Sequence, residues 1–107
     1  MQFELDQIYA QVPGLCAFGL VPSHTSRRPI DVRQFELCLE FLSQCGKSRK
    51  INRRRSSYGL KRYVEEHFGQ YVSNGAFIAA ALYLNFAIEP DGPNACLNIS
   101  ERSLAFA

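Results

Sequence analysis

The chain has 107 residues, enough for one domain, with an ordinary globular fraction of 47% hydrophobic residues and a net charge of +2. No apolar run approaches the roughly 18 residues of a membrane-spanning helix, and the acidic start of the chain does not resemble a secretory signal. We therefore expect one cytoplasmic domain over residues 1–107 without a membrane partner.

The N-terminal part of the chain predicts a helix, a short apolar segment and a loop. Residues 3–12 carry apolar side chains at helical spacing, and Pro13 ends this helix. Residues 15–21 form an apolar run that either a buried strand or a packed loop explains. Residues 23–29 are polar and predict an exposed loop.

The second predicted helix has the clearest start signal in the chain. Asp31 can accept hydrogen bonds from the free amides, and Gln34 three residues later completes a capping box. Gly46 supplies a residue that ends a helix at little conformational cost. Cys38 and Cys45 fall on the inner face of this helix, and the chain has no Cys-x-x-Cys pair, so we expect buried thiols and no metal site.

The charge of the chain is concentrated in residues 47–62, called here the basic segment. Eight of the twelve Lys and Arg residues lie in it, and no Asp or Glu lies between Glu40 and Glu65. The basic segment therefore carries +8, while the four basic and ten acidic residues elsewhere carry −6. Like charges at this density repel one another unless solvent or an anionic partner takes up the field. Its first part, residues 47–55, predicts a flexible exposed connector.

Two more helices follow the connector. A third helix begins at Ser56 or Ser57 and ends before Gly69. Residues 76–84 are apolar on nearly every side, which predicts a central helix. A monomer can bury this helix internally, and a homodimer can bury part of it between subunits.

The C-terminal part predicts a β-hairpin. Residues 86–89 and 95–99 alternate apolar and polar side chains around the turn-forming residues 90–94. Residues 100–107 fit either a last strand or a docked tail. The predicted fold class is mainly α (α+β): a single-domain helical bundle with a C-terminal β-hairpin.

The order helix, basic connector, helix, tight turn, helix, hairpin resembles that of winged helix-turn-helix DNA-binding domains. Residues 57–84 carry the resemblance, with Gly69 in the turn between helices, and it implies a winged-helix-like fold that binds DNA. The chain departs from the pattern at residues 76–84. A recognition helix offers polar side chains to base edges, and this segment offers little but Tyr83.

A second, looser resemblance concerns the source of the chain. The stretches 57–61 and 71–78 are similar to small uncharacterised proteins of bacterial plasmids and phages. This resemblance implies a regulator or accessory factor of a bacterial mobile element.

The candidate nucleic-acid-binding residues lie in the basic segment. Lys and Arg can follow a phosphate backbone and release its counterions, and the amides that open the third helix can add directed contacts. Tyr58 is placed to stack on an unpaired base, whereas we expect Tyr63 and Tyr71 to pack in the core. The predicted site, for DNA in preference to RNA, consists of Lys47, Arg49, Lys50, Asn52, Arg53, Arg54, Arg55, Ser57, Tyr58, Lys61 and Arg62.

Other interpretations remain open. The cations can serve solubility alone, pair with the acidic remainder of the fold, or bind an acidic protein, as in an inhibitor of a host defence complex of the anti-CRISPR type. His67 follows two glutamates and His24 lies in a polar loop, but no nucleophile, base and orienting group can be placed together. We therefore expect a non-enzymatic protein without a cofactor or a metal.

Overall fold

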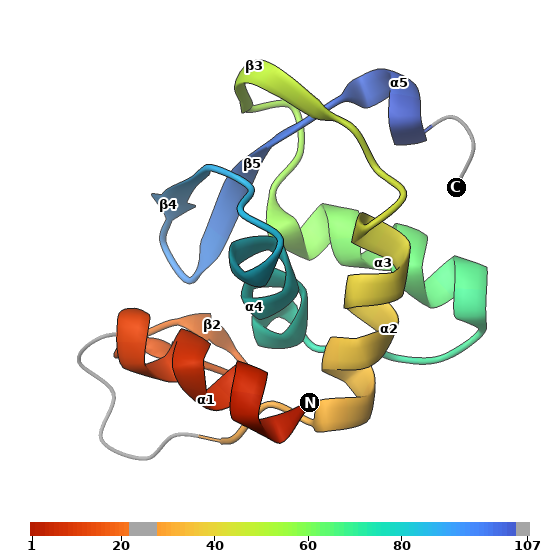
Figure 1. The fold of residues 1–107 in the computed structure, drawn as a ribbon. Coiled ribbons are helices and arrows are strands. Elements are labelled where there is room, and N and C mark those ends of the chain that lie inside the picture. The colour runs from red at the N-terminus through yellow and green to blue at the C-terminus, as the bar shows by residue number, and fades with distance from the viewer. Residues whose placement is uncertain (22–27, 105–107) are drawn as a thin grey trace.

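The chain folds around α4 (Asn74–Tyr83), whose residues 74–81 are all buried. The computed structural model describes residues 1–21 and 28–104, which form a single α+β domain of five helices and two small antiparallel sheets (Figure 1). Ser73 begins α4 by accepting a hydrogen bond from the Ala76 amide at 3.1 Å. The alanine run gives α4 small side chains. These allow three neighbouring helices, the smaller sheet and one strand of the larger sheet to approach α4 closely.

The N-terminal segment covers the start of α4. It comprises α1 (Gln2–Gln11) and the two-residue strands β1 (Leu15–Cys16) and β2 (Gly19–Leu20), which pair antiparallel. The apolar run thus forms two short strands joined by a turn. A Cβ atom added at Gly75 would lie 1.8 Å from the carbonyl oxygen of Cys16, so only glycine permits this approach of backbone to helix.

Two further helices complete the helical layer. In α2 (Val32–Leu42), the Asp31 carboxylate accepts a hydrogen bond from the Gln34 amide at 3.0 Å, as predicted. The Gln34 side chain accepts from the Ser73 amide at 2.9 Å and so does not complete the predicted capping box. Next along the helical layer is α3 (Ser57–Phe68), which ends at Gly69 with a φ of 63°. Phe35, Leu60 and Phe77 from α2, α3 and α4 are almost completely buried and form the centre of the core.

The larger sheet contains β3 (Lys47–Asn52), β4 (Ile88–Asp91) and β5 (Asn94–Ile99) in the order β3-β5-β4. The antiparallel β4–β5 pair runs from Ile88 opposite Leu97 to Asp91 opposite Asn94, and Gly92 in the turn has a φ of 61°. In Figure 1 β3 lies at the end of the molecule away from α1, whereas the β4–β5 turn comes close to β2, where the Leu20 amide donates a hydrogen bond to the Pro93 carbonyl at 2.9 Å.

The expectation of a flexible connector over residues 47–55 is wrong for its first six residues. They form β3, an edge strand that pairs antiparallel with β5 and has an irregular register between Lys47 and Asn52. The pairing supplies hydrogen-bond partners for the β5 backbone, and the Asn98 side chain adds a hydrogen bond to the Ser48 carbonyl at 3.2 Å.

The chain continues after β5 as a short helix, α5 (Glu101–Leu104), with Leu104 buried. A last strand at residues 100–107 is therefore wrong up to residue 104, and a docked tail fits the described part. Residues 105–107, His24 and most of the expected loop at 23–29 lie outside the described residues. No helix in the described residues is both long and apolar enough to cross a membrane.

Candidate nucleic-acid interface

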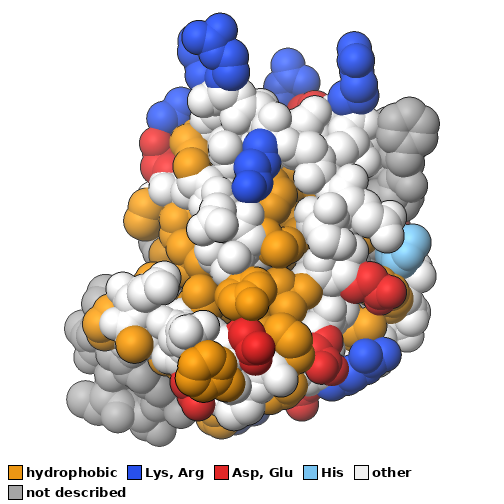
Figure 2. Space-filling model, in the orientation of Figure 1, with side chains coloured by type: hydrophobic (Ala, Val, Ile, Leu, Met, Phe, Trp, Pro, Cys, Tyr) orange, Lys and Arg blue, Asp and Glu red, His pale blue; other side chains and the backbone are white. Residues whose placement is uncertain are grey.

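The cations of the basic segment occupy β3, the turn after it and the first two turns of α3. Figure 2 shows Lys and Arg side chains standing out from the end of the molecule where Figure 1 places β3 and α5. They divide into two groups by their contacts. The free cations are exposed and make no ion pair or side-chain hydrogen bond to any residue that the structure describes: Arg49, Lys50, Arg54 and Arg62. The paired cations have intramolecular partners: Lys47, Arg53, Arg55 and Lys61.

Two of the paired cations join the end of β3 to other elements. Arg53 donates two hydrogen bonds to the Glu89 carboxylate on β4, at 2.7 and 2.6 Å. Arg55 donates two to the Glu101 carboxylate at the start of α5, at 2.8 and 3.3 Å. The hydrogen bonds from Arg53 lower the pKa of Glu89, and those from Arg55, with one from Asn52, lower the pKa of Glu101. The sequence-based alternative of pairing with the acidic remainder is therefore correct for these arginines.

Lys61 is the most enclosed cation of the segment. Its side chain is 8% exposed, and its ammonium group donates a hydrogen bond to the Glu65 carboxylate at 2.8 Å. The same ammonium lies 5.2 Å from the ring centroid of Tyr58 and 4.7 Å from that of Tyr71, within the range of cation–π attraction. Lys61 therefore holds the two tyrosines beside α3, and its enclosure leaves it poorly placed for a phosphate.

Ser57, predicted to contact phosphate, is completely buried. Its hydroxyl donates a hydrogen bond to Asn74 Oδ1 at 2.6 Å and accepts one from the Ala95 amide at 3.0 Å. The Asn74 amide group in turn donates to the carbonyls of Phe18 and Pro93 and to Asn94 Oδ1. This buried hub of Ser57 and Asn74 joins α3, α4, β5 and the β1–β2 turn. The phosphate role of Ser57 is therefore wrong, because both hydrogen-bonding functions of the hydroxyl are occupied inside the protein.

Asn52, another predicted contact, is engaged by the C-terminal part of the chain. Its amide group donates to Glu101 at 2.9 Å and to the Ile99 carbonyl at 3.4 Å, while its Oδ1 accepts from the Arg54 amide. Ser56 takes the N-cap position of α3 without a side-chain capping hydrogen bond. Lys47 is exposed but donates to the Leu84 carbonyl at 2.8 Å, so its ammonium already has one partner.

Aromatic side chains form an open groove next to the basic segment. Phe18, Tyr58 and Tyr71 are 56%, 53% and 62% exposed. With Lys61 and Asn94 they line a hollow of about 540 Å³, called here the aromatic groove. The expectation that Tyr71 packs in the core is wrong, because its ring lies on Lys61 at the surface. Phe18 was not predicted, because it comes from the β1–β2 turn, far from the basic segment in sequence.

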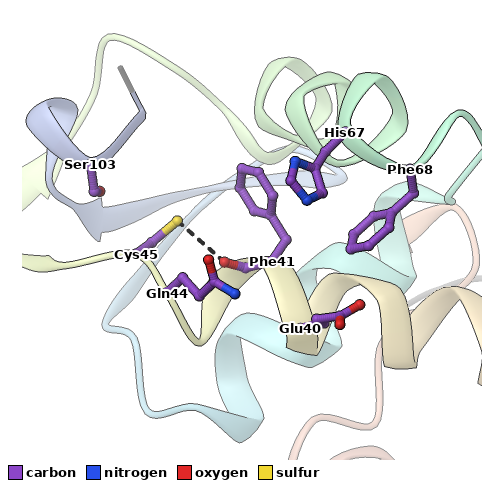
Figure 3. Close-up of a pocket in the computed structure, with 7 residues that line it drawn as sticks. All are labelled: Glu40, Phe41, Gln44, Cys45, His67, Phe68 and Ser103. Carbon is purple, nitrogen blue, oxygen red and sulfur yellow. Dashed lines mark hydrogen bonds between the residues drawn. The ribbon is translucent and has the colours of Figure 1, made fainter. Parts of the chain in front are cut away.

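A separate small cavity of about 110 Å³ is lined by His67, Cys45, Ser103 and Glu40, among other residues (Figure 3). The Cys45 thiol donates to the Phe41 carbonyl at 3.6 Å, and the His67 ring packs edge-on against the rings of Phe41 and Phe68. In Figure 3 the Phe41 ring lies between His67 and Cys45. Burial raises the pKa of the Cys45 thiol, which disfavours the reactive thiolate. This cavity therefore provides no thiol–imidazole pair for catalysis.

The residues of the described part of the chain include no group of three or more His, Cys, Asp and Glu side chains that could hold a metal ion. The candidate interface is instead a surface of four free cations and an adjoining aromatic groove. Comparison of the chain with protein-family models, curated proteins and solved structures found no match, so no known relative constrains the function of this surface.

Proposed function

We propose that the protein is a small non-enzymatic nucleic-acid-binding protein that holds phosphates through Arg49, Lys50, Arg54 and Arg62. The observation that carries this proposal is the division of the cations. Glu65, Glu89 and Glu101 each already bind a paired cation, whereas the four free cations are exposed and form no ion pair with the acids that the structure describes. Two of them still have an acid nearby, since Arg54 attracts Glu101 electrostatically and Arg62 shares a hollow with Glu66. A polyanion supplies the missing charge and gains entropy by releasing its own counterions.

The arrangement of the elements supports a winged-helix-like layout for this binder. The order α2, α3, α4, β4, β5 matches the expected order of helix, helix, helix and hairpin, whereas the strand β3, which lies in the expected connector and pairs with β5, was not expected. However, residues 74–81 of α4 are buried beneath α1 and the β1–β2 pair, so α4 cannot enter a major groove. The proposed contacts are therefore to phosphates and depend little on base sequence.

A regulator or accessory factor of a mobile element is the biological role that we propose for such a binder. The proposal rests on the sequence resemblance to plasmid and phage proteins and on the small size of the domain. Binding that tolerates many sequences suits an accessory factor better than it suits a repressor of one operator.

A competing explanation is that the free cations protect an exposed sheet edge. β3 is an edge strand, and Lys and Arg on such strands discourage pairing with other chains. This explanation predicts no affinity for nucleic acid at moderate salt, so a binding experiment separates the two.

Fluorescence anisotropy with labelled duplex and single-stranded oligonucleotides across a salt series tests the proposal. Four phosphate contacts predict that log Kd rises with log salt concentration with a slope of about 3 to 4. Arg54→Gln removes one free cation and is expected to lower that slope by about 0.7 to 0.9. Arg33→Gln is the control for net charge, since Arg33 is an exposed arginine at the end of α2 away from β3, where it pairs with Glu36 at 3.8 Å. It is expected to leave the slope unchanged.

Two results would refute the phosphate-binding proposal. One is the absence of binding at about 50 mM salt, where phosphate contacts are strong. The other is an equal loss of slope in both variants, which would show a response to net charge alone. The first result would direct attention to an acidic protein surface as the partner.

A further inference from the structure

We infer that the nucleic acid is a single strand, whose bases stack in the aromatic groove while the free cations hold its phosphates. This inference rests on the proposed function and adds the class of substrate. It is carried by the exposure of Phe18, Tyr58 and Tyr71, which each leave more than half of their surface open to solvent in one groove. Large aromatic side chains gathered at the surface mark a binding site more often than a structural need.

The aromatic groove adjoins one hollow on each side, and each hollow is lined by arginine together with one carboxylate, Glu66 in one and Asp31 in the other. Tyr58 also lines a hollow with Arg55 and Arg62, and thus joins the groove to the basic segment. On the other side, Phe18 and Tyr71 also line a hollow with Arg28, whose guanidinium lies 5.8 Å from the Phe18 ring centroid. Aromatic and cationic side chains therefore alternate along one path, as stacking and phosphate binding along a strand require.

The groove is built to keep its rings in place. Lys61 lies against the rings of Tyr58 and Tyr71, and its own position is fixed by the hydrogen bond to Glu65. Phe18 is held from the backbone, because its carbonyl accepts a hydrogen bond from the Asn74 side chain at 3.1 Å. Fixed rings lose little conformational freedom when a base stacks on them, which favours binding.

The bases of a duplex cannot stack on the rings of the aromatic groove, because they are already stacked on one another and expose only their edges. An unpaired base presents its face to a ring whatever its identity, so stacking tolerates all sequences. The cations on both flanks of the groove favour a strand with a phosphate on either side of each base. An apolar peptide would supply no anion to the exposed Arg62, whereas Arg55 already pairs with Glu101.

The test uses alanine variants of the groove and of an exposed aromatic residue outside it. Tyr71→Ala and Phe18→Ala are expected to weaken binding to a labelled oligothymidylate of about 15 nucleotides by about five- to a hundredfold. The salt slope should stay unchanged, because no phosphate contact is lost. Tyr71→Phe keeps the ring and should bind as the wild type does. Phe3→Ala is the matched control, since Phe3 is 69% exposed on α1.

A photochemical readout locates the bases directly. A strand carrying 5-iodouracil is expected to cross-link on irradiation to Phe18, Tyr58 or Tyr71, with the adduct identified by mass spectrometry. The same strand bound to Tyr71→Ala should lose any adduct at that position and give less cross-linked protein overall.

The possible results separate this inference from the proposed function. If groove variants bind the oligothymidylate as tightly as Phe3→Ala while Arg54→Gln lowers the salt slope, the phosphate surface stands and the stacking groove is refuted. Tighter binding to a duplex than to a single strand, or adducts only outside the groove, would also refute it. If the wild type binds no nucleic acid, both proposals fail together.

Discussion

Ser57→Ala distinguishes a structural hydroxyl from a phosphate ligand in the basic segment. The substitution removes the donor to Asn74 Oδ1 and the acceptor for the Ala95 amide while leaving both partners buried. A buried polar group without a partner costs about 1–3 kcal/mol, and two such groups arise here. Together the two groups would cost about 2–6 kcal/mol. We expect the free energy of unfolding to fall by about 2–4 kcal/mol, the lower part of that range, because the surrounding chain can relax.

The loss is large for a domain of this size. A change of 1 kcal/mol shifts the melting temperature of a domain of 60–100 residues by about 4–8 °C, so a loss of about 2–4 kcal/mol in Ser57→Ala should lower it by about 8–32 °C. Urea unfolding followed by circular dichroism gives the free energy, and a thermal scan gives the midpoint. Ser56→Ala is the matched control: it removes the neighbouring hydroxyl, which makes no capping hydrogen bond to α3, and should shift stability by less than about 0.5 kcal/mol.

Binding measured on the same variants completes the test. Below its melting temperature, folded Ser57→Ala should keep the wild-type salt slope and affinity for DNA, because the hydroxyl lies inside the protein. Unchanged stability with a loss of affinity would refute the buried hub and restore Ser57 to the interface. Equal destabilisation by both serine substitutions would show that the argument from buried partners is wrong.

Three other perturbations follow from the structure. Glu89→Gln with Glu101→Gln should flatten the pH dependence of stability below about pH 4.5. Because the pKa values of the two carboxyls are lowered in the folded protein, their ion pairs stabilise the fold above the ordinary pKa, and this stabilisation is lost as the pH falls. Urea unfolding at several pH values measures the effect. A plot of the free energy of unfolding against pH that runs parallel to that of the wild type would contradict the prediction. Gly75→Ala should destabilise the fold more than Gly59→Ala in the same unfolding assay, because a Cβ at 75 meets the Cys16 carbonyl at 1.8 Å whereas nothing lies within 4 Å of one at 59; equal effects would refute the close approach. Thiol reagents should modify the native protein slowly, because burial raises the pKa of the Cys38, Cys45 and Cys96 thiols. The fourth cysteine, Cys16, is also buried. Rapid modification of any of the four cysteines at neutral pH would contradict this prediction.

The sequence predicted the features that depend on neighbouring residues. The start of α2 at Asp31 and the end of α3 at Gly69 each rest on a hydrogen bond or a dihedral angle within a few residues. The apolar character of residues 76–84 was sufficient to predict a central helix. Each of these features depends on residues close in sequence, and each is present in the structure.

The features that the sequence did not reveal depend on contacts between distant parts of the chain. β3 has a mostly polar sequence, and its partner β5 lies more than forty residues later, so no periodicity indicated a strand. Charge density alone does not show which cations are paired, and Glu89 and Glu101 proved to be the partners of Arg53 and Arg55. Phe18 joins Tyr58 and Tyr71 only because the buried hub brings the β1–β2 turn to α4.

The exposed position of the free cations on the edge strand β3, in the turn after it and on α3 has a consequence for how this protein can evolve. Arg49, Lys50 and Arg54 contribute nothing to the buried core or to the hub, so they can be gained or lost one at a time while folding is preserved. Ser57, Asn74 and Gly75 have no such latitude, because each fills a role that few side chains can satisfy. If the surface binds a polyanion as proposed, selection can adjust the strength of that binding without a compensating change in the interior.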